Sequence, residues 1–172
     1  MGVDWELGVV ALGLDTLPRT SRSDVRYDQR MEVSDVRRRL RAAIEGAKVS
    51  AAERRARTAE ASRAYDEILE TVAVPAFHSV VNALVGEGHR FKVTTPGRAA
   101  RLSPERAPGD FIELSLDTER DTPAVLLFAS RGRGRRVVAT ERILREGSQI
   151  AELTEEEIVS ALLDELIPFI ER

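Results

Sequence analysis

The feature that most constrains this fold is an apolar stripe with helical spacing that restarts out of phase at Pro75. Side chains that recur at i, i+3, i+4, i+7, i+8 and i+11 share one face of an α-helix. Beyond the proline the same spacing resumes, shifted by one residue. Because proline removes a helical hydrogen bond and clashes with the preceding turn, we expect a kink or break near Ala73–Pro75. The stripe consists of Ala61, Ala64, Tyr65, Ile68, Leu69 and Val72, and then of Phe77, Val80, Val81, Leu84 and Val85.

A capping box predicts where this long helix begins. Ser50 is followed three residues later by Glu53, whose side chain can reach back to the backbone of the cap. Residues 35–48 have helical spacing of their own behind Ser34, so a separate short helix is expected there. Residues 16–34 are polar and lack an apolar period, which indicates a linker.

Strand patterns separated by short turns fill the region from His89 to Leu144. Alternation in residues 89–94 and 111–116 predicts two half-buried strands, and the apolar run 124–129 predicts a central strand covered on both faces. Residues 136–144 form the next strand, and residues 99–103 can pair as a short one. The connections are too short for parallel crossovers, so we expect an antiparallel meander of four to five strands.

A second capping box, Thr154 with Glu157, predicts a final amphipathic helix packed on this sheet. Together with the long kinked N-terminal helix and the meander, it places the chain in the α+β class. We expect an N-terminal apolar segment and polar arm in residues 1–34, a helical extension in 35–75 and a compact domain in 76–172. The apolar face of the final helix comprises Ile158, Val159, Leu162, Leu163, Leu166, Phe169 and Ile170.

Composition favours a cytoplasmic protein. The chain has no cysteine, which excludes disulfides and thiolate chemistry. It contains no run of about 18 uncharged apolar residues, and Asp4 and Glu6 stand where an export signal carries basic residues. We therefore expect no membrane insertion. Arginine supplies 24 of the 26 basic residues, a bias typical of a GC-rich bacterial genome.

Charge is distributed unevenly along the chain. Residues 19–63 carry 13 basic and 7 acidic side chains, whereas residues 145–172 carry 2 basic and 8 acidic ones. These complementary regions can attract each other within one molecule or between two, an effect that salt weakens.

The usual catalytic motifs are missing, and we expect no enzyme activity, no cofactor and no metal site. The string GRGRRV at 132–137 lacks the third glycine and the strand-to-helix setting of a dinucleotide-binding loop. His78 and His89 have no nucleophile elbow near them in sequence. The acids of DTERDT at 117–122 begin like a calcium loop but lack its glycine and its final glutamate, which favours a hairpin turn.

Two apolar regions are candidate protein interfaces. The N-terminal segment is suited to docking on a partner or on the chain's own domain, because it combines a tryptophan with alternating apolar residues. The helix before Pro75 needs a cover for its stripe, either the chain's own sheet or a second copy, and we favour a homodimer. The interface candidates are Val3, Trp5, Leu7 and Val9 in the first region, and Tyr65, Ile68, Leu69 and Val72 in the second.

An arginine-rich string, SRGRGRR at 130–136, is the alternative candidate site. On a hairpin tip its arginines could clamp phosphates, or they could protect strand edges from aggregation. We favour protection, because the chain as a whole is acidic whereas nucleic-acid modules are usually basic. The phosphate-binding candidates are Arg131, Arg133, Arg135 and Arg136.

The sequence therefore predicts a non-enzymatic scaffold or adaptor that self-associates and binds a protein partner. The alternative prediction is a nucleic-acid-binding accessory protein that uses the arginine-rich hairpin and the basic arm.

Overall fold

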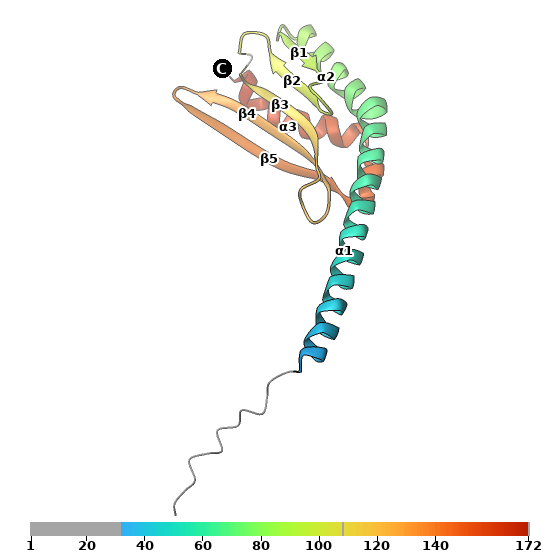
Figure 1. Ribbon diagram of the computed structural model, residues 1–172. Coiled ribbons are helices and arrows are strands. Elements are labelled where there is room, and N and C mark those ends of the chain that lie inside the picture. The colour runs from blue at the N-terminus through green and yellow to red at the C-terminus, as the bar shows by residue number, and fades with distance from the viewer. Residues whose placement is uncertain (1–31, 108, 172) are drawn as a thin grey trace, which may run out of the picture. The chain divides into compact units, whose positions relative to one another are not determined.

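The computed structural model describes residues 32–107 and 109–171. The chain divides into two units, with the boundary between Ala42 and Ala43. Of the first unit the structure describes a helical segment, and the second contains the sheet and the core. A long helix, a five-stranded antiparallel sheet and a C-terminal helix confirm the predicted α+β class (Figure 1).

The helices and strands follow one another in the predicted order. The helical elements are α1 (Val33–Ile68), a π-helical turn η1 (Leu69–Ala73), α2 (Val74–Gly86), a 3-10 turn η2 (Gly147–Glu152) and α3 (Glu155–Ile170). The strands are β1 (Phe91–Thr94), β2 (Ala100–Pro104), β3 (Phe111–Asp117), β4 (Ala124–Arg133) and β5 (Arg136–Glu146).

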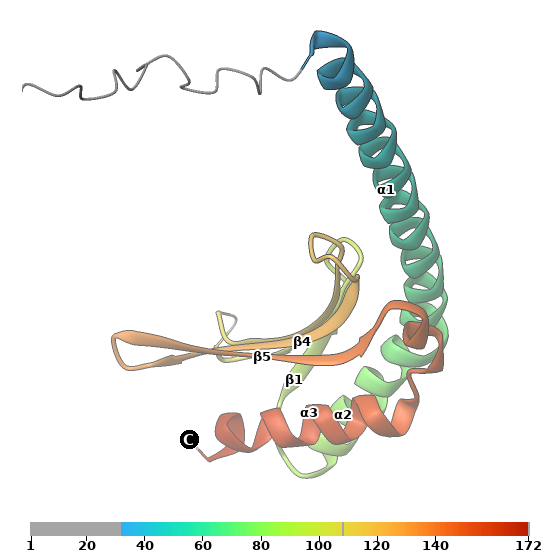
Figure 2. The same cartoon turned by 90° about the horizontal axis from the view of Figure 1, so that it is seen from below.

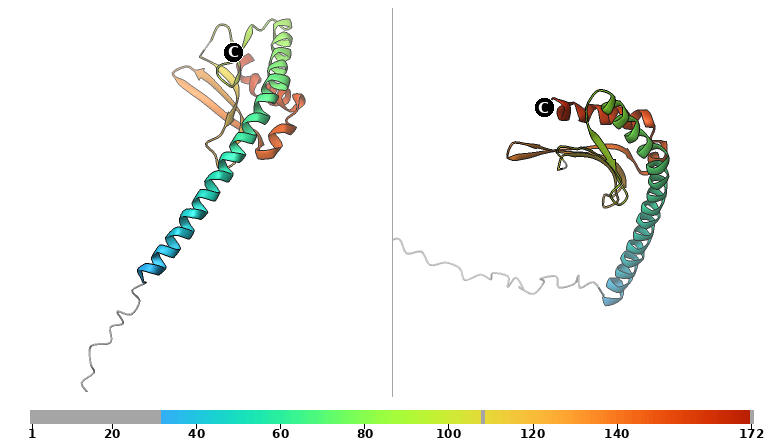
Figure 3. Two further views of the ribbon diagram at one scale, coloured as in Figure 1. Left: turned by 45° about the vertical axis from the view of Figure 1, so that its right-hand side comes forward. Right: turned by 90° about the horizontal axis from the view of Figure 1, so that it is seen from above.

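The sheet is a meander in which each strand pairs antiparallel with the next, in the order β1-β2-β3-β4-β5. Helices α2 and α3 pack together on the same face of this sheet (Figures 2 and 3). Apolar residues at alternate strand positions, such as Leu102, Ile112 and Leu127, point into the core between sheet and helices.

Helix α1 is continuous, so the prediction of a short helix followed by a new helix at Ser50 is wrong. Ser50 and Glu53 lie in its interior. A capping box acts only where the residues before it leave the helical conformation. Here the alanine-rich residues on both sides, including Ala47 and Ala51, favour continued helix.

The predicted irregularity near Ala73–Pro75 takes the form of the π-helical turn η1. The amide of Val74 donates to the carbonyl of Leu69, five residues earlier, instead of four. Pro75, in the first turn of α2, has no N–H to donate, and the wider turn relieves the crowding that its ring causes in a regular helix.

The π turn also explains the phase shift of the apolar stripe. In a regular α-helix, Tyr65 and Phe77 would project about 120° apart, because they are twelve residues apart at about 100° each. One extra residue in the π turn reduces this angle to about 20°. Both side chains are fully buried against the same sheet.

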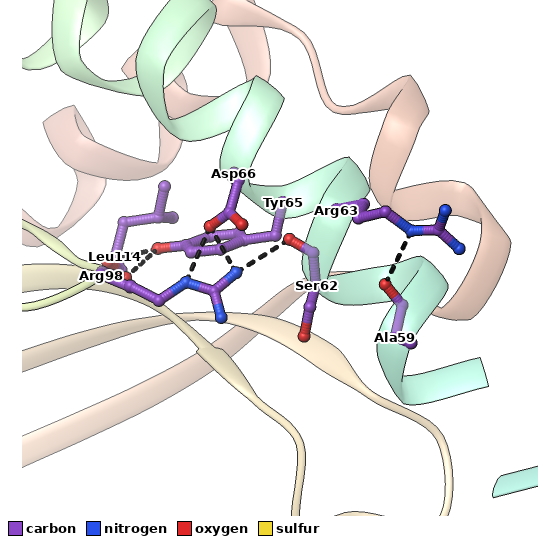
Figure 4. A network of polar contacts seen from close by, with 7 residues as sticks. All are labelled: Ala59, Ser62, Arg63, Tyr65, Asp66, Arg98 and Leu114. Atoms are coloured by element: carbon purple, nitrogen blue, oxygen red, sulfur yellow. Dashed lines mark hydrogen bonds and ion pairs between the residues drawn. The ribbon is translucent and has the colours of Figure 1, made fainter. Parts of the chain in front are cut away.

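Tyr65 fastens α1 to the sheet. Its hydroxyl lies 3.1 Å from the carbonyl oxygens of both Arg98 and Leu114, and its single O–H group is shared between these two acceptors (Figure 4). Burial raises the pKa of this phenol, because its anion would lose solvation, and the nearby Glu113 acts in the same direction. Arg98 makes a second attachment by donating its Nε to Asp66 at 2.7 Å and its Nη2 to the Ser62 carbonyl at 2.9 Å.

Helix α3 begins with the predicted capping box, formed by Thr154 and Glu157. The hydrogen bond from the Thr154 amide is the main cause that lowers the pKa of Glu157, and Arg145 of β5 contributes. Strand β5 binds the helix again through Arg142 with Asp164 at 2.8 Å. The acidic face of α3 is thus partly neutralised by the last strand.

The apolar face of α3 is only partly covered. Ile158, Leu162 and Leu166 are buried as predicted, but Leu163 and Ile170 are exposed. The predicted face spans a wider arc of the helix than the sheet and α2 cover. The uncovered part includes Ile167 as well.

The continuous helix Val33–Gly86 contains a stretch that, by length and composition alone, could cross a membrane. The core helix of a soluble protein has the same properties, and Ala73, Ala76 and Phe77 of this helix are fully buried. The stretch is therefore weak evidence for membrane insertion.

The π turn predicts how the chain responds to single-residue deletions. Deleting exposed Glu70 together with Pro75→Ala should leave a regular helix with both stripes still in phase, and the fold should be retained. Deleting exposed His78 should rotate Val80 and Leu84 about 100° away from the sheet and cost at least about 3 kcal/mol. Urea unfolding followed by circular dichroism compares the two. Equal loss of stability in both would contradict the role of the extra residue.

The hydroxyl of Tyr65 gives a second prediction. Tyr65→Phe should lower the free energy of unfolding by about 1–3 kcal/mol at pH 7, because buried carbonyl groups lose a donor. Since the folded-state pKa of Tyr65 lies above its usual 10.0, the wild type keeps the full contribution below pH 10 and loses stability above it as the unfolded chain ionises. The gap between the two proteins should therefore narrow above pH 10. A gap that widens there would disprove this assignment.

Candidate functional site

The exposed part of α1 carries an apolar stripe, which we call the α1 stripe and define as Val33, Val36, Leu40 and Ile44. All four side chains are exposed. Their spacing continues through Ala47, Ala51 and Thr58 to Tyr65, so they occupy the face of the helix that packs on the sheet further along. Coverage increases along this face, from exposed Ala47 through half-buried Ala51 and Thr58 to buried Ala61. The apolar spacing of α1 therefore includes exposed as well as buried residues.

Basic side chains border the α1 stripe. At 100° per residue, Arg37 and Arg41 follow one edge and Arg39 lies beyond the other, whereas Asp35 and Glu53 lie on the opposite face. Arg38 pairs with Asp35 at 2.7 Å and Lys48 with Glu45 at 2.9 Å. Within the described ranges the three bordering arginines form no ion pair, so their charges are available to a partner.

Four predicted interface residues of this helix lie in the core instead of on the surface. Tyr65, Ile68 and Leu69 are buried, and Val72 packs partly buried against them. This part of the stripe was expected to pack either on the chain's own sheet or on a second copy. In the structure it packs in the core of its own chain. The location of these residues is thereby corrected, while self-association itself stays a prediction.

The other predicted interface residues, Val3, Trp5, Leu7 and Val9, lie outside the described residues. Their docking role stays a prediction.

The arginine-rich string forms a tighter hairpin than the sequence suggests. Strand β4 extends to Arg133 and β5 starts at Arg136, so the turn consists of Gly134 and Arg135. Gly134 has a φ of 63°, which a glycine adopts without strain. Arg131 is therefore a strand residue and half-buried, whereas the other three arginines are exposed.

Two of these arginines face the end of α3. Arg131 and Arg133 line a cavity of about 330 Å³ together with Pro168 and Glu171. In the part of the chain that the structure describes, none of the four hairpin arginines forms an ion pair. By contrast, Arg120 binds Asp117 at 2.9 Å. The hairpin tip thus carries four positive charges, and two of these arginines share a cavity with the carboxyl group of Glu171.

The residues considered for catalysis or metal binding have structural roles or solvent exposure. Asp117 accepts a hydrogen bond from the Glu119 amide at 2.9 Å, which lowers the pKa of its carboxyl group and closes the predicted turn. His78 is exposed on α2, and half-buried His89 lines a cavity of about 370 Å³ with Arg106 and Phe169. Among the described residues no cluster of His, Asp and Glu could hold a metal ion.

Comparison with known proteins gives no relative: no family model, no curated protein and no solved structure matches this chain. Function therefore has to be inferred from the surfaces described above.

Proposed function

We propose that this protein is a non-enzymatic scaffold or adaptor that acts through self-association and protein binding, in the cytoplasm. The observation that supports the proposal best is the α1 stripe, which continues the core face of α1 onto an exposed part of the helix.

An exposed helix of this kind gains stability from a partner. Isolated helices are marginal in water, and most of their stability in proteins comes from packing an apolar face. The α1 stripe is about 16 Å long, from Val33 to Ile44, at 1.5 Å per residue. It is too short for a stable coiled coil on its own, so the bordering arginines have to supply part of the selectivity for a partner.

Self-association through the α1 stripe is tested by Leu40→Asp, with Val49→Asp as the matched control. Both residues are 57% exposed on α1, but Val49 lies on the opposite face. Leu40→Asp should produce a monomer at concentrations where the wild type self-associates, because a charge would enter the apolar contact. Val49→Asp should behave as the wild type. Light scattering coupled to gel filtration measures the mass of each.

Two results would refute this proposal. One is a wild type that remains monomeric at high micromolar concentration and recovers no protein partner. The other is equal behaviour of the Leu40 and Val49 variants. Removal of residues 1–15 tests the N-terminal segment separately, since its loss should reduce recovery of a partner without changing the number of copies in the assembly.

Binding of nucleic acid is a second candidate function, supported by the four hairpin arginines, which form no ion pair with any described residue. Three of them are exposed at one tip, and Arg133 lies opposite Arg136 in the strand register. Arginines in such an arrangement can contact successive phosphates.

This candidate predicts weak, salt-dependent binding of nucleic acid. Replacing all four arginines by alanine should reduce affinity by about tenfold or more at about 50 mM salt and flatten the dependence of affinity on salt. Fluorescence anisotropy with a labelled oligonucleotide measures both, and Arg142→Ala in β5 is a control outside the tip. Absence of wild-type binding at low salt would eliminate the candidate.

A further inference from the structure

Helix α3 presents a second exposed apolar stripe, which we call the α3 stripe and define as Leu163, Ile167 and Ile170. These side chains are 53%, 56% and 37% exposed. Their spacing of i, i+4 and i+7 places them on one face of the helix, away from the buried Ile158, Leu162 and Leu166. The stripe is about 10 Å long at 1.5 Å per residue. It resembles the α1 stripe in being apolar, helical and uncovered.

The two stripes have opposite electrostatic surroundings. Residues 33–57 of α1 contain eight basic and three acidic side chains, whereas residues 155–170 of α3 contain five acidic and no basic ones. Along the α3 stripe, Glu156 and Glu171 are exposed and form no ion pair with another described residue. Asp164 lies along the same edge and is bound to Arg142.

Like charges argue against α1 packing on a second α1. A parallel or antiparallel pair of these helices would bring two strongly basic segments together, and like charges at a contact are destabilising. The same argument disfavours two α3 helices. The pairing that joins apolar to apolar and basic to acidic is α1 of one copy on α3 of another.

We propose that the α1 stripe docks on the α3 stripe of a second copy of this chain. This inference rests on the proposed self-association and names its partner surface. Arg37 and Arg41 lie beside the α1 stripe and provide the charges that Glu156 and Glu171 attract. Because the contact joins two different surfaces, it either closes into a reciprocal dimer or continues as a chain of copies. Either form is consistent with a scaffold.

Charge reversal in the full-length protein tests this contact. Arg37→Glu with Arg41→Glu changes the α1 edge, and Glu156→Arg with Glu171→Arg changes the α3 edge. None of these four residues takes part in an ion pair with a described residue of its own chain. The matched control is Arg38→Glu with Arg63→Glu, which alters net charge equally on the face of α1 opposite the stripe.

Each edge variant alone should raise the concentration needed for self-association by about tenfold or more, and the control should not. An equimolar mixture of the two edge variants should recover at least part of the wild-type assembly, because the reversed charges are again complementary. Higher salt should weaken the wild-type assembly. Sedimentation velocity over a concentration series measures all of these proteins, and circular dichroism verifies that each is folded.

The outcomes separate this inference from the proposed function. If Leu40→Asp abolishes assembly but the α3 variant assembles as the wild type, the α3 docking site is overturned and the scaffold proposal stands. If the mixture of folded edge variants shows no recovery, the docking site is overturned as well. If the wild type is monomeric and instead binds phosphatidylglycerol vesicles through Leu40, both proposals fail.

Discussion

The extra residue in the π turn is the constraint on which the rest of the structure depends. It keeps Tyr65 of α1 and Phe77 of α2 on the same sheet, although a regular helix would turn them away from each other. The sheet can therefore pack against both helical segments with one continuous core. Tyr65 and Arg98 then join the C-terminal part of α1 to strand and loop residues through hydrogen bonds.

Ion pairs link helix α3 to strand β5. Strand β5 supplies Arg142 to Asp164 and Arg145 to Glu157, so two acidic side chains of α3 are neutralised within the molecule. Glu156 and Glu171 form no ion pair with a described residue, and they lie beside the exposed apolar residues of α3. Of the basic side chains in residues 33–57 of α1, only Arg38 and Lys48 form ion pairs with described residues. The α1 stripe and the α3 stripe are both apolar and have opposite charges beside them, and the proposed self-association rests on this complementarity.

The capping-box motif occurs twice in the sequence, but only one of the two occurrences begins a helix. Thr154 with Glu157 forms a capping box, because η2 ends just before it and the cap residue is extended. Ser50 with Glu53 has the same spacing but lies within continuous helix, since nothing upstream ends α1. Likewise the strand starting at Arg136 was predicted, but the turn before it was predicted too long: strand β4 continues to Arg133, because pairing with β5 supplies its backbone with hydrogen-bond partners. Local patterns thus located the elements, and pairing determined their ends.

The sequence by itself determined the α+β class, the order of its elements, the irregularity at Pro75 and the opposite charges of the two terminal helices, because these depend on local periodicity and composition. Only the tertiary structure decided which apolar positions are buried. Leu40 and Tyr65 lie on one face of α1 with equivalent spacing, yet one is exposed and the other is in the core. Leu162 and Leu163 are neighbours in a single apolar run, and only Leu162 is buried. Whether an apolar residue is buried depends on whether another element of the fold packs against it. The residues of that element are far away in the sequence, so local periodicity does not reveal them.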